Sequence, residues 1–352
     1  MAKEDYFIKR KADTLRRLDN VLSCLPRFVR DYFLGIENVT SPLTRLNYAT
    51  DLTIFFDFIS KRYGVDISEI DLDILNEIKA QEIELYLSYL SSFDHNGTHH
   101  MCNEKAKARK LASIRSMYKY FFNKDLIVAN TAAKVSSPKL HEKEIVRLEK
   151  DEVSELIRTA ETGDGLTDRQ LKYQKNTSVR DVALLSLFLG TGIRISELIG
   201  LNIEDIFFDN NSFIVTRKGG NKTILYFNDE VKQELLKWLV IRNEDEKIPL
   251  NERALFCSLQ GKRISLRAVQ NLVKKYAKIV TPLKKITPHK LRSTFGTNLY
   301  HETGDIYMVA DFLGHKDVNT TKKHYAAISD DLRRNAIKNF SIQGDKSDDN
   351  NS

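Results

Sequence analysis

The chain has 352 residues, enough for two domains with substantial cores, and its 55 Lys and Arg residues against 48 Asp and Glu give a net charge of +7. This basic balance favours a polyanionic partner. Three widely spaced cysteines argue against a disulfide framework, and no Cys/His spacing suggests a metal site, so no metal is expected. The sequence has no apolar run long enough to span a bilayer and no apolar segment after Met1, which predicts a cytoplasmic protein without a membrane partner.

Helical periodicity dominates the first part of the chain. Leucines at helical spacing predict a helical extension over residues 1–35. Residues 36–135 are interpreted as a helical domain, in which Ser41 and Pro42 open a helix, residues 71–90 form one or two more, and residues 104–122 form another. The polar stretch 93–100, which contains His99 and His100, is interpreted as a solvated loop rather than a metal site.

The predicted helix over residues 104–122 has one apolar and one basic side. The basic side carries Lys105, Lys107, Arg109, Lys110, Arg115 and Lys119. A solvated face is the simpler interpretation of this side, and a helix laid along phosphates is the alternative.

A polar stretch, residues 136–147, is the predicted linker to a second domain over residues 148–340, and residues 341–352 are a predicted disordered tail. Helices are expected over 148–160, 229–240, 265–278, 291–303, 306–313 and 320–340, with a loop over 161–178 and two helices meeting at a Thr-Gly turn within 180–200. Thr287 and Pro288 indicate a helix start, after which His289 and Arg292, three positions apart, would share one helical face. Between them, residues 207–208, 213–216 and 224–227 predict a small antiparallel sheet of about three strands. The expected fold is therefore mainly α, a helical N-terminal domain followed by a C-terminal α+β domain.

Five side chains of the second domain form a set suited to one chemistry. In chain order they are Arg194, His289, Arg292, His315 and Tyr325. Breaking a phosphodiester with a protein hydroxyl requires a nucleophile, stabilisation of the non-bridging oxygens and a proton for the departing oxygen. Arginine binds phosphate through a planar fork, and histidine moves protons near neutral pH. Each residue alone is unremarkable, since Arg194 could pair with Glu197 and Tyr325 could be core, but the five rarely occur together by chance.

The residues lie in three short motifs, 191–198 around Arg194, 287–292 with His289 and Arg292, and 313–325 with His315 and Tyr325. These motifs resemble those of the tyrosine recombinase (phage integrase) family, and within it the Xer-like site-specific recombinases. The resemblance is close over residues 180–328 and looser over residues 36–138, which match the family's helical core-binding domain. It implies that Tyr325 attacks the scissile phosphate to form a 3′-phosphotyrosyl link, that Arg194 and Arg292 clamp the phosphate, and that His289 takes part in proton transfer. It also implies that His315 hydrogen-bonds the phosphate.

The family's catalytic lysine protonates the leaving 5′-oxygen from a β-hairpin turn, here residues 218–222. The family pattern is Gly-Lys-Gly-Asn-Lys, and counting back from Asn221 without gaps places Gly219 at the lysine position. Lys218 is the preferred residue, with a one-residue shift of the turn, and Lys222 is the alternative.

The resemblance also implies the partners. Double-stranded DNA recombination sites are the expected substrate, bound by a homotetramer that exchanges C-terminal helices, and no cofactor is expected because the phosphotyrosine ester conserves the energy of the broken bond. The expected DNA contacts are Thr44, Arg45, Lys105, Arg109, Arg115, Lys222, Arg267 and Lys290.

Two biological roles stay open, chromosome dimer resolution as part of the cell cycle and chromosome partition, and DNA integration or excision of a mobile element. Tyr325 follows His315 by ten positions (325 − 315), whereas many Xer proteins have nine. Two other functions are the alternatives, a type IB-like topoisomerase and a non-catalytic DNA-binding accessory protein.

Overall fold

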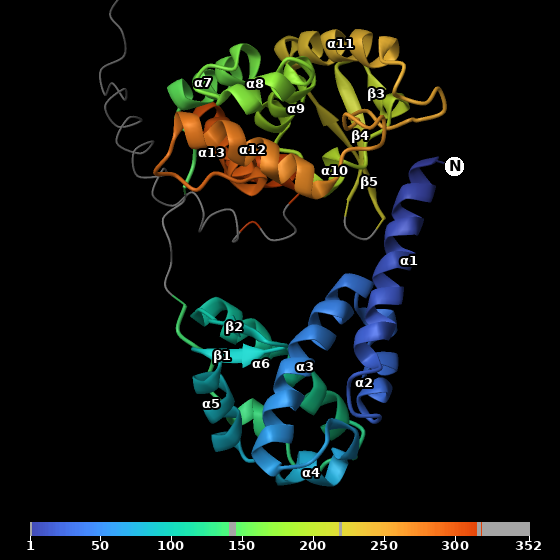
Figure 1. The fold of residues 1–352 in the computed structure, drawn as a ribbon, viewed down its shortest axis with the longest axis vertical. Coiled ribbons are helices and arrows are strands. Elements are labelled where there is room, and N and C mark those ends of the chain that lie inside the picture. The colour runs from blue at the N-terminus through green and yellow to red at the C-terminus, as the bar shows by residue number, and fades with distance from the viewer. Residues whose placement is uncertain (1, 141–145, 218–219, 315–317, 319–352) are drawn as a thin grey trace, which may run out of the picture. The chain divides into compact units, whose positions relative to one another are not determined.

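The chain divides into two compact units, one ending at Lys143 and the other beginning at Glu144 (Figure 1). The computed structural model describes residues 2–140, 146–217, 220–314 and 318. The division between the units falls within the stretch that the sequence predicts as a linker, residues 136–147. The predicted helix over residues 320–340 and the predicted tail over 341–352 lie outside the described residues.

The first unit is helical, with one small hairpin. Its elements are α1 (Ala2–Leu22), α2 (Val29–Gly35), α3 (Pro42–Tyr63), α4 (Leu72–Glu77), α5 (Ala80–Tyr89), β1 (Phe93–His95), β2 (Thr98–His100) and α6 (Glu104–Phe122). The core of this unit contains Tyr32 from α2, Phe55 from α3, Tyr86 from α5 and Phe121 from α6, all of which are fully buried. The second half of the predicted 1–35 extension therefore packs into the same core as the helices that follow it.

Two of the three long helices of this unit, α3 and α6, begin where the sequence predicts. The Ser41 hydroxyl accepts a hydrogen bond from the Thr44 N–H (3.2 Å), and Pro42 occupies the first turn of α3. Asn103 caps α6 in the same way through the Ala106 N–H (2.9 Å). The expected helix over residues 104–122 is confirmed to the residue.

The stretch over residues 93–100 is a β-hairpin, so its interpretation as a loop was wrong. Strands β1 and β2 pair antiparallel, with Phe93 opposite His100 and His95 opposite Thr98. Asn96 (φ 52°) and Gly97 (φ 70°) both adopt the left-handed conformation that a tight two-residue hairpin turn requires. The Asn-Gly pair was a hairpin signal that the polar composition outweighed. All three residues of β2 are exposed, as a solvated segment should be.

Lys110 does not lie on an exposed basic side of α6. Its side chain is buried, and its ammonium donates to Asp51 Oδ1 of α3 (2.9 Å). Arg109 donates to the other carboxylate oxygen of Asp51 (2.5 Å), and Asp51 is 1% exposed. Helices α3 and α6 are therefore joined by a buried ion pair that helical periodicity could not predict, because Asp51 lies 59 positions away.

Replacing Asp51 by alanine should lower the free energy of unfolding of the first unit by about 3 kcal/mol, because the Lys110 ammonium would be left buried without its counter-charge. Urea unfolding of the full chain separates the two units spectroscopically. Trp238 is the only tryptophan and is buried in the second unit. Far-UV circular dichroism reports the helices of both units, so only the part of its transition that does not follow the Trp238 fluorescence should shift to lower urea, while the Trp238 transition should stay in place.

Asp13 offers the matched control, since it pairs with Arg16 within α1 and both side chains are mostly exposed. Asp13→Ala should shift neither transition, as exposed pairs contribute little. An Asp51→Ala protein as stable as the wild type would contradict a structural role for this pair.

The second unit combines helices with a three-stranded sheet. Its elements are α7 (Lys150–Thr162), α8 (Asp168–Gln174), α9 (Ser178–Thr191), α10 (Ile195–Leu198), β3 (Ile206–Phe207), β4 (Ser212–Thr216), β5 (Lys222–Tyr226), α11 (Asp229–Glu244), α12 (Leu266–Val280), α13 (Pro288–Thr303) and α14 (Ile306–Leu313).

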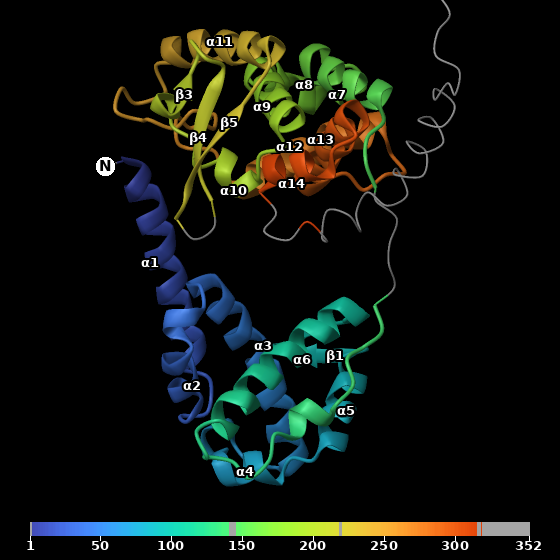
Figure 2. The same ribbon diagram turned by 180° about the vertical axis from the view of Figure 1, so that it is seen from behind.

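Helix α9 is the centre of this unit. It packs against α7, α11 and α13, and most of its length is buried, which explains its nearly continuous apolar sequence (Figure 2). The strands pair antiparallel in the order β3-β4-β5, and their apolar residues alternate between buried and outward positions. The predicted small antiparallel sheet is confirmed.

Helix α8 lies inside the stretch that the sequence predicts as a loop, residues 161–178. It begins with a capping box, in which Thr167 and Gln170 satisfy each other's backbone N–H groups. Its polar composition hid it, and the Thr-x-x-Gln spacing was the signal that could have found it. The expected fold class is confirmed, mainly α with a small antiparallel sheet in an α+β second unit. Across the described residues, no helix is long and apolar enough to cross a membrane.

Candidate active site

Arg194 lies at the sharp turn between α9 and α10. Helix α9 ends at Thr191 and is capped by Gly192, whose φ of 59° favours glycine and whose Cβ, if present, would lie 2.4 Å from the Phe295 ring. Arg194 follows as the N-cap residue of α10. Glu197 fixes it twice, because its carboxylate accepts from the Arg194 backbone N–H (3.0 Å) and from the guanidinium Nη1 (2.9 Å). The pairing with Glu197 is therefore present, and it orients Arg194.

Arg292 reaches the same place from helix α13. It is 7% exposed, and its guanidinium donates through Nη1 to the Gly192 carbonyl and through Nη2 to the Leu313 carbonyl. The first contact ties α13 to the end of α9, and the second ties it to the end of α14. Arg292 is thus held at the junction of three helices.

The two arginines meet at the C-terminal end of α14. Arg194 Nη2 donates to the carbonyl oxygens of Leu313 (3.1 Å) and Gly314 (3.0 Å), so Arg194 and Arg292 share the Leu313 oxygen as an acceptor. This brings together residues that are 98 positions apart in the chain (292 − 194) and places both beside the residue that precedes His315. Two convergent guanidinium groups on a fixed scaffold are suited to binding a phosphodiester.

A third arginine, which the sequence reasoning missed, lies beside this pair. Arg217 follows strand β4 directly, and its Nη2 donates to the Phe312 carbonyl (3.2 Å), also at the end of α14. Burial lowers the pKa of its guanidinium, Glu197 opposes that shift, and the positive charge of Arg194 adds to it. No motif marks Arg217, because its partner is a backbone carbonyl rather than a side chain.

His289 lies in the first turn of α13 and is exposed. It precedes Arg292 by three positions, so the two lie on neighbouring parts of one helical face, as the sequence predicts. Pro288 occupies the first turn and confirms the predicted helix start. The imidazole is therefore accessible at the edge of the arginine pair.

Three of the expected catalytic residues, Lys218, His315 and Tyr325, lie outside the described residues. Arg217 and Gly220 on either side of the undescribed part of the hairpin turn, and Gly314 before His315, are described. Lys222, the alternative catalytic lysine, is exposed at the start of β5, where it pairs with Thr216 of β4. Gly314, the last described residue before His315, has a φ of 55° and ends α14.

The α6 side chains that are expected to contact DNA differ in their exposure and in their hydrogen-bond partners. Lys105 is exposed in the first turn, and Arg109 is half-exposed while paired with Asp51. Arg115 instead donates to the carbonyl oxygens of Ala132 and Val135 and to the Ser137 hydroxyl (2.7 Å). It holds the chain that leaves the first unit.

The remaining expected contacts are divided between the two units. Thr44 is half-buried in the first turn of α3, and Arg45 is 6% exposed with an ion pair to Glu37 (2.7 Å). Arg267 is exposed in the first turn of α12, and Lys290 is half-buried on α13. Arg45 and Arg115 would have to release an internal partner before they could meet a phosphate.

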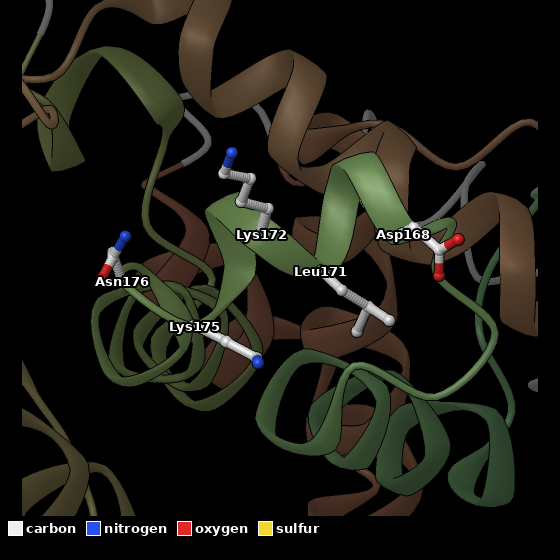
Figure 3. Close-up of a pocket in the computed structure, with 5 residues that line it drawn as sticks. All are labelled: Asp168, Leu171, Lys172, Lys175 and Asn176. Carbon is white, nitrogen blue, oxygen red and sulfur yellow. The ribbon is translucent and has the colours of Figure 1, made fainter.

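A pocket on the second unit lies elsewhere (Figure 3). All five residues that line it are on α8 or directly after it, and they are Asp168, Leu171, Lys172, Lys175 and Asn176. None of the described candidate residues lines this pocket. The described residues also contain no group of three or more His, Cys, Asp or Glu side chains that could hold a metal ion. The arginine pair therefore marks the candidate site.

The family model described as the phage integrase family matches residues 146–331, more than half of the chain and all of the described arginine site. This chain belongs to the phage integrase family. The match begins at residue 146, within the last two residues of the predicted linker, and extends beyond Tyr325.

Similar members of the phage integrase family include the tyrosine recombinase XerC of Caldanaerobacter subterraneus subsp. tengcongensis, 32% identical over 87% of this chain and 84% of the relative. The tyrosine recombinase XerS of Streptococcus pneumoniae is 27% identical over 92% of this chain and 98% of the relative. Among solved structures, the XerH site-specific recombinase bound to a palindromic difH substrate in a post-cleavage complex aligns with a TM-score of 0.63. It is 19% identical and covers 84% of this chain and 80% of that one, a likeness of fold.

These comparisons confirm the resemblance that the motifs indicate, a Xer-like tyrosine recombinase of the phage integrase family. They also confirm the expected enzyme class, a tyrosine site-specific recombinase.

Proposed function

We propose that this protein cleaves and rejoins double-stranded DNA at specific sites through a 3′-phosphotyrosyl intermediate formed by Tyr325. The observation that carries the proposal is the convergence of Arg194 and Arg292 on the Leu313 carbonyl, two residues before His315, in a member of the phage integrase family. Guanidinium groups placed there are fixed before DNA arrives, so the phosphate meets a preorganised site.

The reaction assigns one task to each side chain. The Tyr325 phenol loses its proton with the help of His289 and attacks the phosphorus, forming the O–P bond as the P–O5′ bond breaks. Arg194, Arg292 and His315 hold the non-bridging oxygens, where charge accumulates. Glu197 keeps Arg194 aimed at them.

The departing 5′-oxygen takes its proton from a lysine of the β4–β5 turn. Lys218 is the proposed donor, with Lys222 as the alternative. Rejoining is the same reaction in reverse, with a 5′-hydroxyl as the nucleophile. The phosphotyrosine ester retains the energy of the original bond, so the cycle requires neither ATP nor a cofactor.

The proposed DNA contacts are those of the expected set whose side chains are exposed, Lys105, Arg109, Lys222 and Arg267, together with Lys290 and Thr44. Arg45 and Arg115 support the first unit through Glu37 and through backbone carbonyls, and they contribute by holding its surface in shape. A homotetramer on two synapsed sites, with exchange of the segment after Ser329, completes the proposal. Sedimentation of the DNA complex measures that stoichiometry.

Covalent trapping tests the proposed chemistry and identifies the target sequence in the same experiment. A pool of random duplexes, each with a nick that lets the short 5′-hydroxyl fragment diffuse away, is incubated with the protein, and adducts that survive detergent are sequenced. We expect adducts joined through the 3′ end of the cleaved strand and enriched in one sequence. After nuclease digestion, the modified tryptic peptide should be His324–Arg333, which contains Tyr325.

Unmodified protein, or linkage through a 5′ end, would contradict the proposal. Relaxation of a supercoiled plasmid that lacks the enriched sequence would instead favour a topoisomerase. Tight DNA binding without any adduct would favour an accessory protein.

A further inference from the structure

Arg217 belongs to the hairpin turn through its backbone. Its N–H donates to the Asn221 carbonyl (2.8 Å), and its own carbonyl accepts from the Gly220 N–H (3.0 Å). These two bonds close the turn between β4 and β5. Arg217 directly precedes Lys218, and Lys222 directly follows Asn221. Each candidate proton donor is therefore adjacent in sequence to a residue that takes part in these two hydrogen bonds.

Arg217 belongs to the end of α14 through its side chain. Its Nη2 donates to the Phe312 carbonyl, and its Nη1 lies against Gly314 so closely that a Cβ there would stand 1.1 Å away. Gly314 is the residue before His315, and its carbonyl also accepts from Arg194. The guanidinium therefore rests on the same short stretch of backbone that the phosphate-binding arginines hold.

We propose that Arg217 is a positioning residue, which fixes the lysine-bearing turn to the end of α14 so that the proton donor faces the leaving oxygen. This inference rests on the proposed function and deepens it. Hairpin turns joined to a sheet by few bonds are mobile, and a displacement of about 1 Å at a reacting group can cost roughly 100-fold in rate. The Arg217 side chain adds a hydrogen bond from the β4–β5 turn to the end of α14, which the bonds within the hairpin do not provide.

An alternative role for Arg217 would be a third direct ligand of the phosphate. Its geometry favours positioning, because its backbone closes the turn that bears the lysine while its Nη2 bonds the Phe312 carbonyl of α14. The hydrogen bonds that hold Arg194 and Arg292 to the ends of α9 and α14 make no such connection to the turn. The two roles predict different effects of an Arg217 substitution on the cleavage rate when the leaving group is changed, so one experiment can distinguish them.

The test compares two nicked duplexes of the sequence recovered by trapping, one with the natural P–O5′ bond and one with sulfur in the bridging position. A thiolate leaves without a proton because a thiol is far more acidic than an alcohol, so the sulfur substrate does not need the lysine. We expect Arg217→Met to slow adduct formation about 100-fold on the oxygen substrate, and the sulfur substrate to recover most of that loss. Arg217→Lys should behave in the same way, because a point charge lacks the fork that spans Phe312 and Gly314.

Arg253→Met is the matched control, since Arg253 pairs with Glu204 on the surface of the same unit and has no place in the site. It should cleave both substrates at the wild-type rate. The Trp238 fluorescence transition in urea verifies that each variant is folded, and rates are compared per folded protein.

The outcomes separate the two levels of the proposal. A wild-type protein that forms no adduct on either substrate overturns the proposed function and this inference with it. A wild-type protein that is active, with Arg217→Met equally slow on both substrates, overturns positioning and makes Arg217 a phosphate ligand. An Arg217→Met protein as fast as the wild type on the oxygen substrate excludes both roles for Arg217.

Discussion

Replacing Tyr325 by phenylalanine should abolish the covalent DNA adduct, a loss of at least about 10⁴-fold, while DNA affinity stays close to that of the wild type. The substitution removes one oxygen atom and keeps the ring, so packing around it changes little. Without the phenol no bond to phosphorus can form, and the bridging-sulfur substrate cannot compensate, because it assists the leaving group alone. Adduct yield on the nicked duplex and a gel-shift titration measure the two quantities.

Tyr173→Phe provides the control for this prediction. Tyr173 is exposed on α8, and it is neither one of the arginines of the candidate site nor one of the residues that they contact. It should trap DNA at the wild-type rate. Persistent adducts in Tyr325→Phe would mean that another hydroxyl is the nucleophile, and the modified peptide would identify it.

Arg292→Lys should reduce cleavage by about 10³-fold, even though the positive charge is retained. The guanidinium bonds the carbonyls of Gly192 and Leu313 at once, and an ammonium cannot span both and still meet a phosphate. Single-turnover adduct formation, measured on both the oxygen and the sulfur substrate, should show the same loss on each, since the missing interaction is with the phosphate rather than with the leaving group.

A loss of stability alone could imitate this result, and Arg242 provides the control for it. Arg242 is 5% exposed and donates to the carbonyls of Ala254 (3.0 Å) and Glu252 (2.6 Å), so it is an equally buried, carbonyl-bound arginine outside the site. Arg242→Lys should lower the urea midpoint of the Trp238 transition yet leave the rate per folded molecule unchanged. An Arg292→Lys protein with the same behaviour would exclude a role for Arg292 in phosphate binding.

The parts of the fold that could be predicted from sequence are those controlled by local rules. Caps, proline positions and apolar periodicity predicted α3, α6 and α13 at their first residues, and the paired strands of the sheet followed from turn residues and alternation. The β1–β2 hairpin and α8 carried equally local signals, Asn96-Gly97 and the Thr167 capping box, but both lie in polar stretches where the apolar pattern is weak.

The candidate site was predictable only as a set of side chains with a shared chemistry. Arg194, His289 and Arg292 stand in recognisable motifs, so their order alone indicated a phosphate-binding group. Their actual partners are the backbone oxygens of Gly192, Leu313 and Gly314, which every residue type possesses and which no motif encodes. The contact of Arg217 with α14 was not predicted for this reason. The burial of Lys110 was not predicted for a related reason, because its counter-charge, Asp51, comes from another helix.

The shared Leu313 oxygen has a consequence for the protein before it meets DNA. Peptide groups at the C-terminal end of a helix present the negative ends of their dipoles, equivalent to about half an elementary charge. At the end of α14 this partial charge lies among three guanidinium groups and offsets their mutual repulsion. The cations can thus remain gathered without a counter-ion from solution, and small free anions gain little by binding there. A phosphodiester within a long duplex, anchored by many other contacts, is the kind of anion that can compete.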